Sequence, residues 1–317
     1  MSAALGIGLA ALARPAYITT GRDAALGTDR GVDALAARTH AVLDAAYAAG
    51  VRYVDVARSY GRAEEFLASW LAARPAVTDV EIGSKWGYRY VGDWRLDASV
   101  HEVKDHSLAA FTAQLAQTRA LLDDRLDVYH VHSATPDTGV LDDTALHRAL
   151  AGLRDSGVRV GVSTSGPAQA DAVRRALAIR VGGAPLFTSI QSTWNVLETS
   201  AAPALAEAAA AGARVIVKEP VANGLLAPGG TPAEGSAARA AAIADRLGVP
   251  VDQLAIAAAA ARPWAWRVLS GAVDTDQLRS NAAGATLTLP ADVLAELDAL
   301  AEPPEAYWSA RAARSWS

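Results

Sequence analysis

Val51-Arg-Tyr-Val-Asp55-Val-Ala-Arg-Ser-Tyr60-Gly61 is the stretch that decides the fold. Its first half, Val51–Val56, is an apolar, valine-rich run of strand length. Ala/Leu-rich, helix-favouring segments precede it at Ala36–Ala49 and follow it at Ala63–Ala73, and Gly50 ends the first of them as a left-handed cap requires. A short apolar run between two helical lengths predicts a strand of a parallel sheet.

The same alternation of strand and helix continues along the whole chain. Further strand-like runs lie at Ala4–Leu9, Val80–Gly83, Leu126–Val131, Val158–Val162, Leu186–Gln191, Arg214–Val217 and Trp266–Leu269. Helix-favouring stretches follow at His106–Leu122, Thr144–Ser156, Ala168–Ala178, Thr199–Ala211, Val251–Ala261 and Asp274–Ala283. The pattern therefore predicts eight strands that alternate with helices.

Eight such repeats favour an α/β fold of the (β/α)8 TIM-barrel type over a doubly wound sheet. No linker or change of composition divides the chain, so we expect a single domain over residues 1–317. In a barrel, the loops that follow the strands lie on the C-terminal face, where sites are built. The long loops Trp86–Lys104 and Ala222–Pro232 therefore belong to that face. Whether the tail Leu300–Ser317 folds over it remains open.

The composition argues against several classes of function. The 317 residues are 51% hydrophobic and 20% charged with a net charge of −5, which suits a buried core and not the basic face of a nucleic-acid binder. With no cysteine, the chain can have no disulfide, thiolate nucleophile or zinc–cysteine site, and we expect a cytoplasmic protein. The first residues lack a basic segment, and no apolar run is long enough for a membrane span.

Ionisable side chains stand at the ends of three consecutive predicted strands. Asp55 ends an apolar strand, where a buried carboxylate needs a cation. Lys85 follows the next strand and is the first candidate for that partner. His132 follows the strand after it, and Tyr60 lies in the loop after Asp55. His130 points to the same side of its strand as His132. We favour His132 because it is nearer the C-terminal end, and we interpret His130 as a core histidine.

These residues together resemble the motif of the aldo-keto reductase family. The family has Asp-x-Ala-x-x-Tyr-Gly, then a lysine after the next strand and a histidine after the one beyond. The pattern is met here by Asp55, Ala57, Tyr60, Gly61, Lys85 and His132, and the resemblance runs from about Gly6 to Asn281. The ordered combination is specific, whereas single members are not: Asp55 and Lys85 could form a structural ion pair, and Tyr60 could be a surface aromatic residue.

The resemblance implies an oxidoreductase that transfers a hydride between a nicotinamide cofactor and a carbonyl or alcohol substrate, which could be an aldehyde, a ketone or a sugar-like ring. Tyr60 would be the general acid/base. Because the pKa of a free phenol is about 10, a neighbouring ammonium has to lower it. Lys85 would lower the pKa of the phenol, and Asp55 would keep Lys85 charged. A neutral His132 would bind and orient the substrate carbonyl.

The resemblance also implies that NADP(H) lies across the barrel mouth, without a dinucleotide-binding βαβ unit. Gly6-Ile-Gly8 lacks the helix and acidic residue that such a unit needs. The family segments that bind the nicotinamide carboxamide are similar to those holding Ser163, Thr164 and Gln191. The segments that frame the nicotinamide, cover the pyrophosphate or contact the adenine are similar to those holding Pro220, Gly224, Leu225, Gln277 and Asn281.

Two positions depart from the family pattern. Lys218 stands where the family has an aromatic residue on the nicotinamide, and Glu219 stands where it has a serine. A lysine stem can cover an apolar ring but does not replace aromatic stacking. Asp274 and Asp276 stand where relatives that use NADP carry the basic residues that bind the 2′-phosphate. Since a carboxylate repels phosphate but accepts from a ribose hydroxyl, NAD(H) is a possible cofactor.

Aromatic residues are concentrated in the loop after Lys85. We expect these residues to form the wall of a substrate pocket. The expected substrate contacts are Trp86, Trp94 and Trp194, together with Arg58 from the Asp55–Tyr60 motif. Tyr88, Tyr90 and His101, with Trp308 or Trp316 from the tail, are further candidates for this wall. We expect no metal site, because the histidines lack ligand spacing.

Two other functions are compatible with the same residues. The first is a cofactor-binding regulatory protein of the same fold with little turnover, which the unusual Lys218–Glu219 pair keeps open. The second is a barrel lyase or isomerase that uses Lys85 as a Schiff-base amine.

Overall fold

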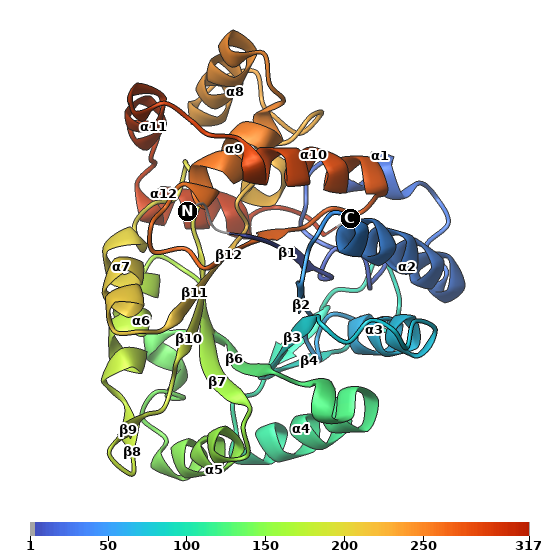
Figure 1. The fold of residues 1–317 in the computed structure, drawn as a ribbon, viewed down its shortest axis with the longest axis vertical. Helices are drawn as coiled ribbons and strands as arrows, with labels where there is room; N and C mark the ends of the chain where they lie inside the picture. The colour runs from blue at the N-terminus through green and yellow to red at the C-terminus, as the bar shows by residue number, and fades with distance from the viewer. Residues whose placement is uncertain (1–3, 317) are drawn as a thin grey trace.

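Eight parallel strands close into a barrel in the computed structural model, which describes residues 4–316 (Figure 1). Their order around the barrel is β1-β12-β11-β10-β7-β6-β3-β2. The strands are β1 (Ala4–Gly8), β2 (Tyr53–Asp55), β3 (Glu81–Trp86), β6 (Val128–Ala134), β7 (Arg159–Thr164), β10 (Ser189–Thr193), β11 (Arg214–Lys218) and β12 (Arg267–Ser270). The predicted (β/α)8 barrel is confirmed; of the expected domain, residues 1–3 and 317 lie outside the described part.

Helices surround the barrel. They are α1 (Arg22–Leu26), α2 (Val32–Ala48), α3 (Ala63–Ala72), α4 (Leu108–Leu122), α5 (Thr144–Asp155), α6 (Gln169–Ala178), α7 (Ala202–Ala210), α8 (Ser236–Leu247), α9 (Val251–Ala260), α10 (Thr275–Thr286), α11 (Ala291–Asp298) and α12 (Pro304–Ala312). Short 3-10 turns occur at η1 (Asp123–Arg125), η2 (Pro136–Thr138) and η3 (Ala222–Gly224). All eight expected helices are present, whereas α1, α8, α11 and α12 were not predicted.

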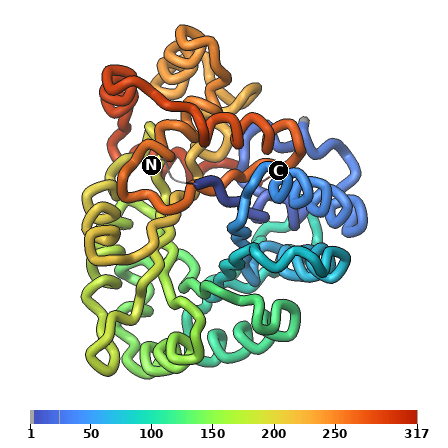
Figure 2. The backbone as a smooth tube through the Cα atoms, in the orientation of Figure 1, coloured from blue at the N-terminus to red at the C-terminus, as the bar shows by residue number. Residues whose placement is uncertain are grey.

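The chain travels once around the ring in sequence order, so that its first and last barrel strands meet (Figure 2). Ala4 pairs with Arg267 and Ile7 with Ser270 in the β1–β12 register. Each strand thus ends on the same face of the barrel, and the loops that follow the strands gather there.

Side chains fill the opposite end of the barrel interior. Tyr53, Val128, Ile216 and Leu269 form a separate buried cluster there. A Cβ atom added at Gly83 would lie 2.2 Å from the hydroxyl oxygen of Tyr53, so this strand position requires glycine. Since this end is packed solid, the space for a ligand lies at the C-terminal mouth.

Two segments expected as loop or tail contain regular structure at that mouth. Within Trp86–Lys104, β4 (Tyr88–Tyr90) and β5 (Glu102–Lys104) pair as an antiparallel hairpin. The tail contains α12 and returns to the mouth, where Trp316 stacks on His101 with ring centroids 4.4 Å apart. The tail therefore does fold over the functional face.

A second hairpin, β8 (Arg180–Val181) with β9 (Ala184–Pro185), leads into β10.

Candidate active site

A buried ion pair lies at the base of the site. Lys85 on β3 donates from its Nζ to Asp55 Oδ2 at the end of β2, at 2.5 Å, and to the carbonyl of Val56 at 3.0 Å. The other carboxylate oxygen of Asp55 accepts from Gln191 Nε2 at 2.7 Å. Lys85 is fully buried and Asp55 nearly so. Burial lowers the pKa of Lys85, and the Asp55 charge opposes that change. The pair is thus held from three sides.

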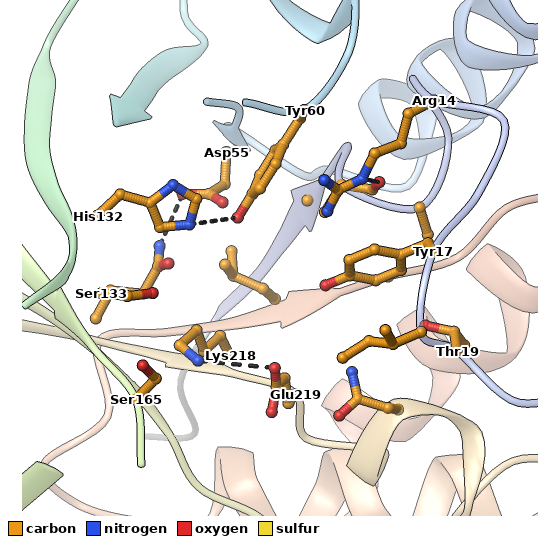
Figure 3. Close-up of a pocket in the computed structure, with 18 of the residues that line it drawn as sticks. Arg14, Tyr17, Thr19, Asp55, Tyr60, His132, Ser133, Ser165, Lys218 and Glu219 are labelled. Atoms are coloured by element: carbon orange, nitrogen blue, oxygen red, sulfur yellow. Dashed lines mark hydrogen bonds and ion pairs between the residues drawn. The ribbon is translucent and has the colours of Figure 1, made fainter. Parts of the chain in front are cut away.

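Tyr60 and His132 face each other above this pair (Figure 3). Their Oη and Nε2 atoms lie 3.5 Å apart, a long hydrogen bond, and the Lys85 Nζ lies 4.7 Å from the centre of the Tyr60 ring. The Oγ of Ser59 lies 3.4 Å from the other ring nitrogen of His132. Four side chains from three strands and one loop therefore converge as the motif indicated.

Burial controls the protonation of the Tyr60 phenol and the His132 ring. Burial, followed by the nearby charge of Lys85, holds the pKa of His132 well below its usual range, so the ring is neutral at pH 7. We expected Lys85 to lower the pKa of the Tyr60 phenol; instead burial, reinforced by the Asp55 carboxylate, raises that pKa well above 10. Burial is the largest cause of this rise, and the Lys85 ammonium is itself paired with Asp55 at 2.5 Å. The phenol is a protonated donor at neutral pH.

His130, the rival histidine, lies deeper in the barrel. Its Nε2 is 2.9 Å from Ser189 Oγ, and burial lowers the pKa of this ring to about 3. His132 lines the mouth pocket, whereas His130 does not. The structure therefore places His132 beside Tyr60, whereas His130 is part of the barrel interior.

An elongated pocket of about 250 Å³ occupies the mouth. One end contains Tyr60, His132 and Tyr88; the other extends along Lys218, Pro220, Asn223, Ser270 and Gly271. The loop after β1 completes its walls with Arg14, Tyr17 and Thr19 (Figure 3), and the tail adds Arg311 and Trp316.

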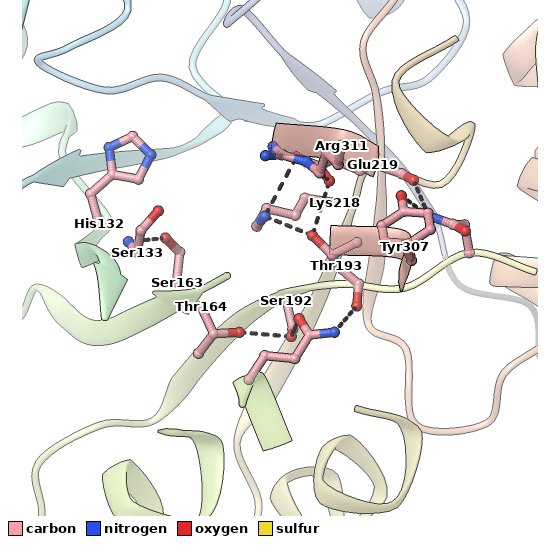
Figure 4. Close-up of polar contacts among 12 residues, drawn as sticks. His132, Ser133, Ser163, Thr164, Ser192, Thr193, Lys218, Glu219, Tyr307 and Arg311 are labelled. Atoms are coloured by element: carbon pink, nitrogen blue, oxygen red, sulfur yellow. Dashed lines mark hydrogen bonds and ion pairs between the residues drawn. The ribbon is translucent and has the colours of Figure 1, made fainter. Parts of the chain in front are cut away.

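A charged network joins β11 to the tail (Figure 4). Glu219 accepts from Arg311 of α12 through both carboxylate oxygens and from Thr193 Oγ1 at 3.2 Å. Lys218 Nζ donates to the same Thr193 hydroxyl at 2.7 Å. Glu219 is held in a left-handed conformation, φ 56°, while its carbonyl accepts from Asn195 at 3.0 Å. These contacts fix a strained residue at the pocket wall.

The charges of this network shift one another. Burial lowers the pKa of Lys218 to about 8. Burial alone would raise the pKa of Glu219, but the charges of Arg311 and Lys218 outweigh it and lower the pKa to about 2. The network carries two cations and one anion below pH 8, which leaves a net positive charge in the pocket wall.

Several expected cofactor residues are engaged within the protein. Ser163 Oγ accepts from the Ser133 amide at 2.8 Å, and Thr164 Oγ1 lies 2.7 Å from Ser192 Oγ. Neither Ser163 nor Thr164 lines the pocket. Gln191 does line it, although its Nε2 is bound to Asp55. Of these three, only Gln191 faces the ligand space.

The residues expected at the adenine end also have internal roles. Asn281 accepts from Ser270 at 2.7 Å and donates to Asp252 at 2.8 Å, and it is buried. Its side-chain oxygen and nitrogen therefore each have a partner within the protein, and the expected adenine contact stays a prediction. Asp274 caps the start of α10 by accepting from two backbone amides. Gln277 Oε1 accepts from the Val273 amide at 3.0 Å.

The loop after β11 reaches across to the loop after β1. Thr20 donates its amide to the carbonyl of Asn223 at 2.9 Å. A Cβ atom at Gly224 would lie 2.3 Å from the Thr20 carbonyl oxygen, and this glycine has a φ of 93°. Pro220 lines the pocket, whereas Gly224 and Leu225 lie beside it. These contacts tie the two loops into a bridge at the pocket edge.

The four expected substrate contacts, Arg58, Trp86, Trp94 and Trp194, are not among the residues that line this pocket. Lys85 points into the barrel, so its neighbour Trp86 points outward to pack on Phe111, with ring centroids 5.2 Å apart. Arg58 pairs with Glu64. The remaining two are anchored elsewhere: Trp194 packs on Trp264, and Trp94 donates to the Arg30 carbonyl at 3.0 Å.

The aromatic rings that line the pocket are those of Tyr17, Tyr60, Tyr88, His132 and Trp316. Tyr17 and its neighbour Arg14 were not among the sequence candidates. The available signal was position, since they follow the first strand and the loop after any barrel strand lies on the functional face. Among residues 4–316 no group of three or more metal-ligating side chains gathers, and no helix there is long and apolar enough to cross a membrane.

Comparison with known proteins agrees with the barrel fold. Residues 24–302 match the model of the Aldo/keto reductase family. Among solved structures, the chain is similar to the holo form of aldo-keto reductase AKR11C1 from Bacillus halodurans, at 22% identity and a TM-score of 0.69, over 94% of this chain and 92% of that one. It is similar to glycerol dehydrogenase AKR11B4 from Gluconobacter oxydans, at 18% identity and a TM-score of 0.69, over 93% and 90%. No curated protein matches it.

Proposed function

Because the chain belongs to the aldo/keto reductase family, we propose that it transfers a hydride between a nicotinamide cofactor and an aldehyde, ketone or the corresponding alcohol, with Tyr60 as general acid/base. The observation that carries this proposal is the placement of the Tyr60 hydroxyl 3.5 Å from His132 Nε2, above the buried Lys85–Asp55 pair. Two hydrogen-bonding groups can thus meet at one substrate oxygen.

The pocket residues fit a nicotinamide dinucleotide. Lys218 and Arg311 supply positive charge in the pocket wall, as an anionic pyrophosphate requires. Asn223 lines the pocket, and its side-chain oxygen is buried without a hydrogen-bond partner among the described residues. Such an acceptor is suited to a ribose hydroxyl or a carboxamide of a bound ligand. When bound, the nicotinamide supplies or accepts the hydride.

The residues divide the remaining chemistry among them. In reduction, the Tyr60 phenol donates its proton to the carbonyl oxygen, and the raised pKa keeps that proton available at neutral pH. Neutral His132 orients the carbonyl. Lys85, paired with Asp55, has its Nζ 4.7 Å from the centre of the Tyr60 ring and would stabilise the phenolate that forms. In oxidation the same phenolate accepts the proton.

A screen of aldehydes, ketones and sugars with NADH and NADPH tests this function. Wild-type protein should turn over at least one carbonyl class, and Tyr60→Phe should lower kcat by roughly 10²- to 10⁴-fold, the usual contribution of general acid–base catalysis. A Tyr60→Phe variant with wild-type turnover would show that another group transfers the proton.

For the cofactor, we propose that NADP(H) and NAD(H) are used with similar efficiency. Asp274 caps α10. Arg279, the basic residue closest to Asp274 in the sequence, is paired with Asp276 at 2.5 Å on the exposed surface. No unpaired cation is thus offered to a 2′-phosphate on this turn. The ratio of kcat/KM for NADPH and NADH measures the preference, and a hundredfold advantage of NADPH would contradict the proposal.

The network of Glu219 and Arg311 supports a second candidate, a cofactor-binding protein with little turnover, because it holds the tail against the pocket. Quenching of protein fluorescence by NADPH without turnover of any carbonyl would favour that candidate. A Schiff-base role for Lys85 is not supported, since Lys85 is fully buried and does not line the pocket.

A further inference from the structure

Two cavities meet at the barrel mouth. The inner pocket holds Tyr60 and His132, and an outer cavity of about 440 Å³ is lined by the segment that joins β4 to β5. Tyr88, Glu102 and Trp316 line both cavities and thus form a neck between them. The rest of the outer lining is largely polar and includes Asp97, Ser99 and His101. A ligand whose reacting end lies at Tyr60 therefore has polar space beyond it.

Arg14 is a fixed donor at the inner side of this neck. Its Nε donates to the Ala10 carbonyl at 3.0 Å, and its Nη1 donates to the Ser59 carbonyl at 3.3 Å and to Glu102 Oε1 at 2.8 Å. The guanidinium carbon lies 5.0 Å from the centre of the Tyr60 ring (Figure 3). Arg14 is 2% exposed. Within residues 4–316, its second terminal nitrogen, Nη2, has no acceptor.

Glu102 provides the matching acceptor. One carboxylate oxygen accepts from Arg14, while the other, Oε2, has no hydrogen-bond partner in the described part of the chain. The Glu102 side chain is 18% exposed and borders both cavities. The ion pair therefore offers one donor nitrogen and one acceptor oxygen side by side, at no net charge.

We propose that Arg14 and Glu102 determine specificity by selecting neutral, polyhydroxylated carbonyl substrates or their alcohols, with the polar remainder of the substrate in the outer cavity. This inference rests on the function proposed above. A hydroxyl group both donates and accepts, so two adjacent hydroxyls can accept from Arg14 Nη2 and donate to Glu102 Oε2 at the same time.

Other substituents form a hydrogen bond with only one member of the Arg14–Glu102 pair or with neither. An anionic group beside the carbonyl would be repelled by Glu102, and a cationic group would be repelled by Arg14. An aliphatic chain would displace water from both charged groups without replacing its hydrogen bonds. Tyr17, Tyr88 and Trp316 supply apolar ring faces for the C–H groups of such a substrate.

The test compares glyceraldehyde with propanal, which differ only by two hydroxyl groups, each corrected for its free aldehyde content. Wild-type protein should prefer glyceraldehyde in kcat/KM by about tenfold or more. Glu102→Gln should lower that preference by about tenfold and raise kcat/KM for the anionic aldehyde glyoxylate, a gain that general damage to the fold does not produce. Glu207→Gln, which breaks an exposed pair with Arg174, is the matched control and should change neither value.

Binding of xylitol, followed by calorimetry in the presence of NADPH, separates this inference from the proposed function. Weaker xylitol binding by Glu102→Gln than by wild type and Glu207→Gln supports the inference even if no carbonyl in the screen above is turned over, a result that would refute the proposed function. An unchanged glyceraldehyde preference in Glu102→Gln, or equal xylitol binding by all three proteins, overturns the inference.

Discussion

At the scale of single residues, the molecule depends on compensating buried charges. Lys85 is fully buried, and its ammonium is matched by Asp55 at 2.5 Å. The Asp55 carboxylate is in turn bound by Gln191. Such a pair contributes little net stability relative to apolar side chains, but removing one partner leaves the other charge uncompensated.

Lys85→Met should therefore lower the free energy of unfolding by about 3–5 kcal/mol, because Asp55 would remain charged in the barrel. Urea denaturation followed by circular dichroism measures the change. The double variant Asp55→Asn/Lys85→Met should recover most of the loss while remaining inactive. Arg174→Met, which breaks an exposed pair, serves as the control and should change stability little. A fully stable Lys85→Met protein would contradict the compensation.

Lys218 predicts a pH dependence of cofactor binding. Burial lowers its pKa to about 8, so raising the pH through 8 converts the ammonium into a neutral amine. The pocket then loses one positive charge, while Arg311 remains charged. We expect the Kd of NADH to rise by up to about tenfold between pH 7 and pH 9.5.

Fluorescence titration of wild type and Lys218→Met across this pH range checks the assignment. The variant should bind more weakly at pH 7 and show a nearly flat dependence. An equal rise of Kd in both proteins would assign the titration to another group.

At the scale of elements, the tail is docked by a few polar contacts. Arg311 binds Glu219, Arg314 donates to the Ala222 carbonyl at 3.0 Å, and Tyr307 accepts from Asn195 at 3.0 Å. Because Glu219 is also held at a positive φ, loss of its partner should release both the helix and the strained residue.

Arg311→Ala should therefore expose α12 to cleavage by chymotrypsin after Tyr307 or Trp308, both of which are buried in the wild type. We expect cleavage to be at least about tenfold faster, as local opening becomes more frequent. Arg246→Ala, which removes the exposed pair between α8 and α11, is the control. Equal cleavage of wild type and Arg311→Ala would show that apolar packing alone holds the tail.

The elements also show which features a sequence can predict. The eight strands were predictable because each is a short apolar run buried on both faces between helical lengths. The helix α8 was missed because it lies beside α9, outside the regular alternation, with no strand between them. The hairpin of β4 and β5 is partly exposed, so its sequence lacks the apolar alternation of a strand.

The placement of a site residue was predictable where its position along a strand decides which way its side chain points. Asp55, Lys85 and His132 lie at strand ends, and topology alone brings strand ends together. Trp86 was misplaced because the alternation of side chains that sends Lys85 inward sends its neighbour outward. Arg14 and Glu102 were missed since they meet only through two loops that are distant in sequence.

At the scale of the whole molecule, the filled end of the barrel limits variation in the strands. The Tyr53 hydroxyl is buried without a hydrogen-bond partner among the described residues, and it occupies the space above Gly83. Gly83→Ala should destabilise the protein by about 1–3 kcal/mol through overpacking. Tyr53→Phe should be neutral or stabilising, because it removes an unsatisfied polar group.

Combined, Tyr53→Phe should partly rescue Gly83→Ala, since the clash is with the tyrosine oxygen at 2.2 Å. The thermal midpoints of the four proteins form a double-mutant cycle that measures this coupling. Additive effects would show that the two positions do not compete for the same space.

The pairing of β1 with β12 has a consequence for synthesis on the ribosome. β12 follows the other seven barrel strands in the sequence, so the ring cannot close until residues 267–270 have emerged. Until then the growing chain presents two open sheet edges, of β1 and of the strand most recently added, to any neighbouring nascent chain. The pairing that closes the ring is thus available only after β12 has emerged, and until it forms the exposed strand edges favour aggregation.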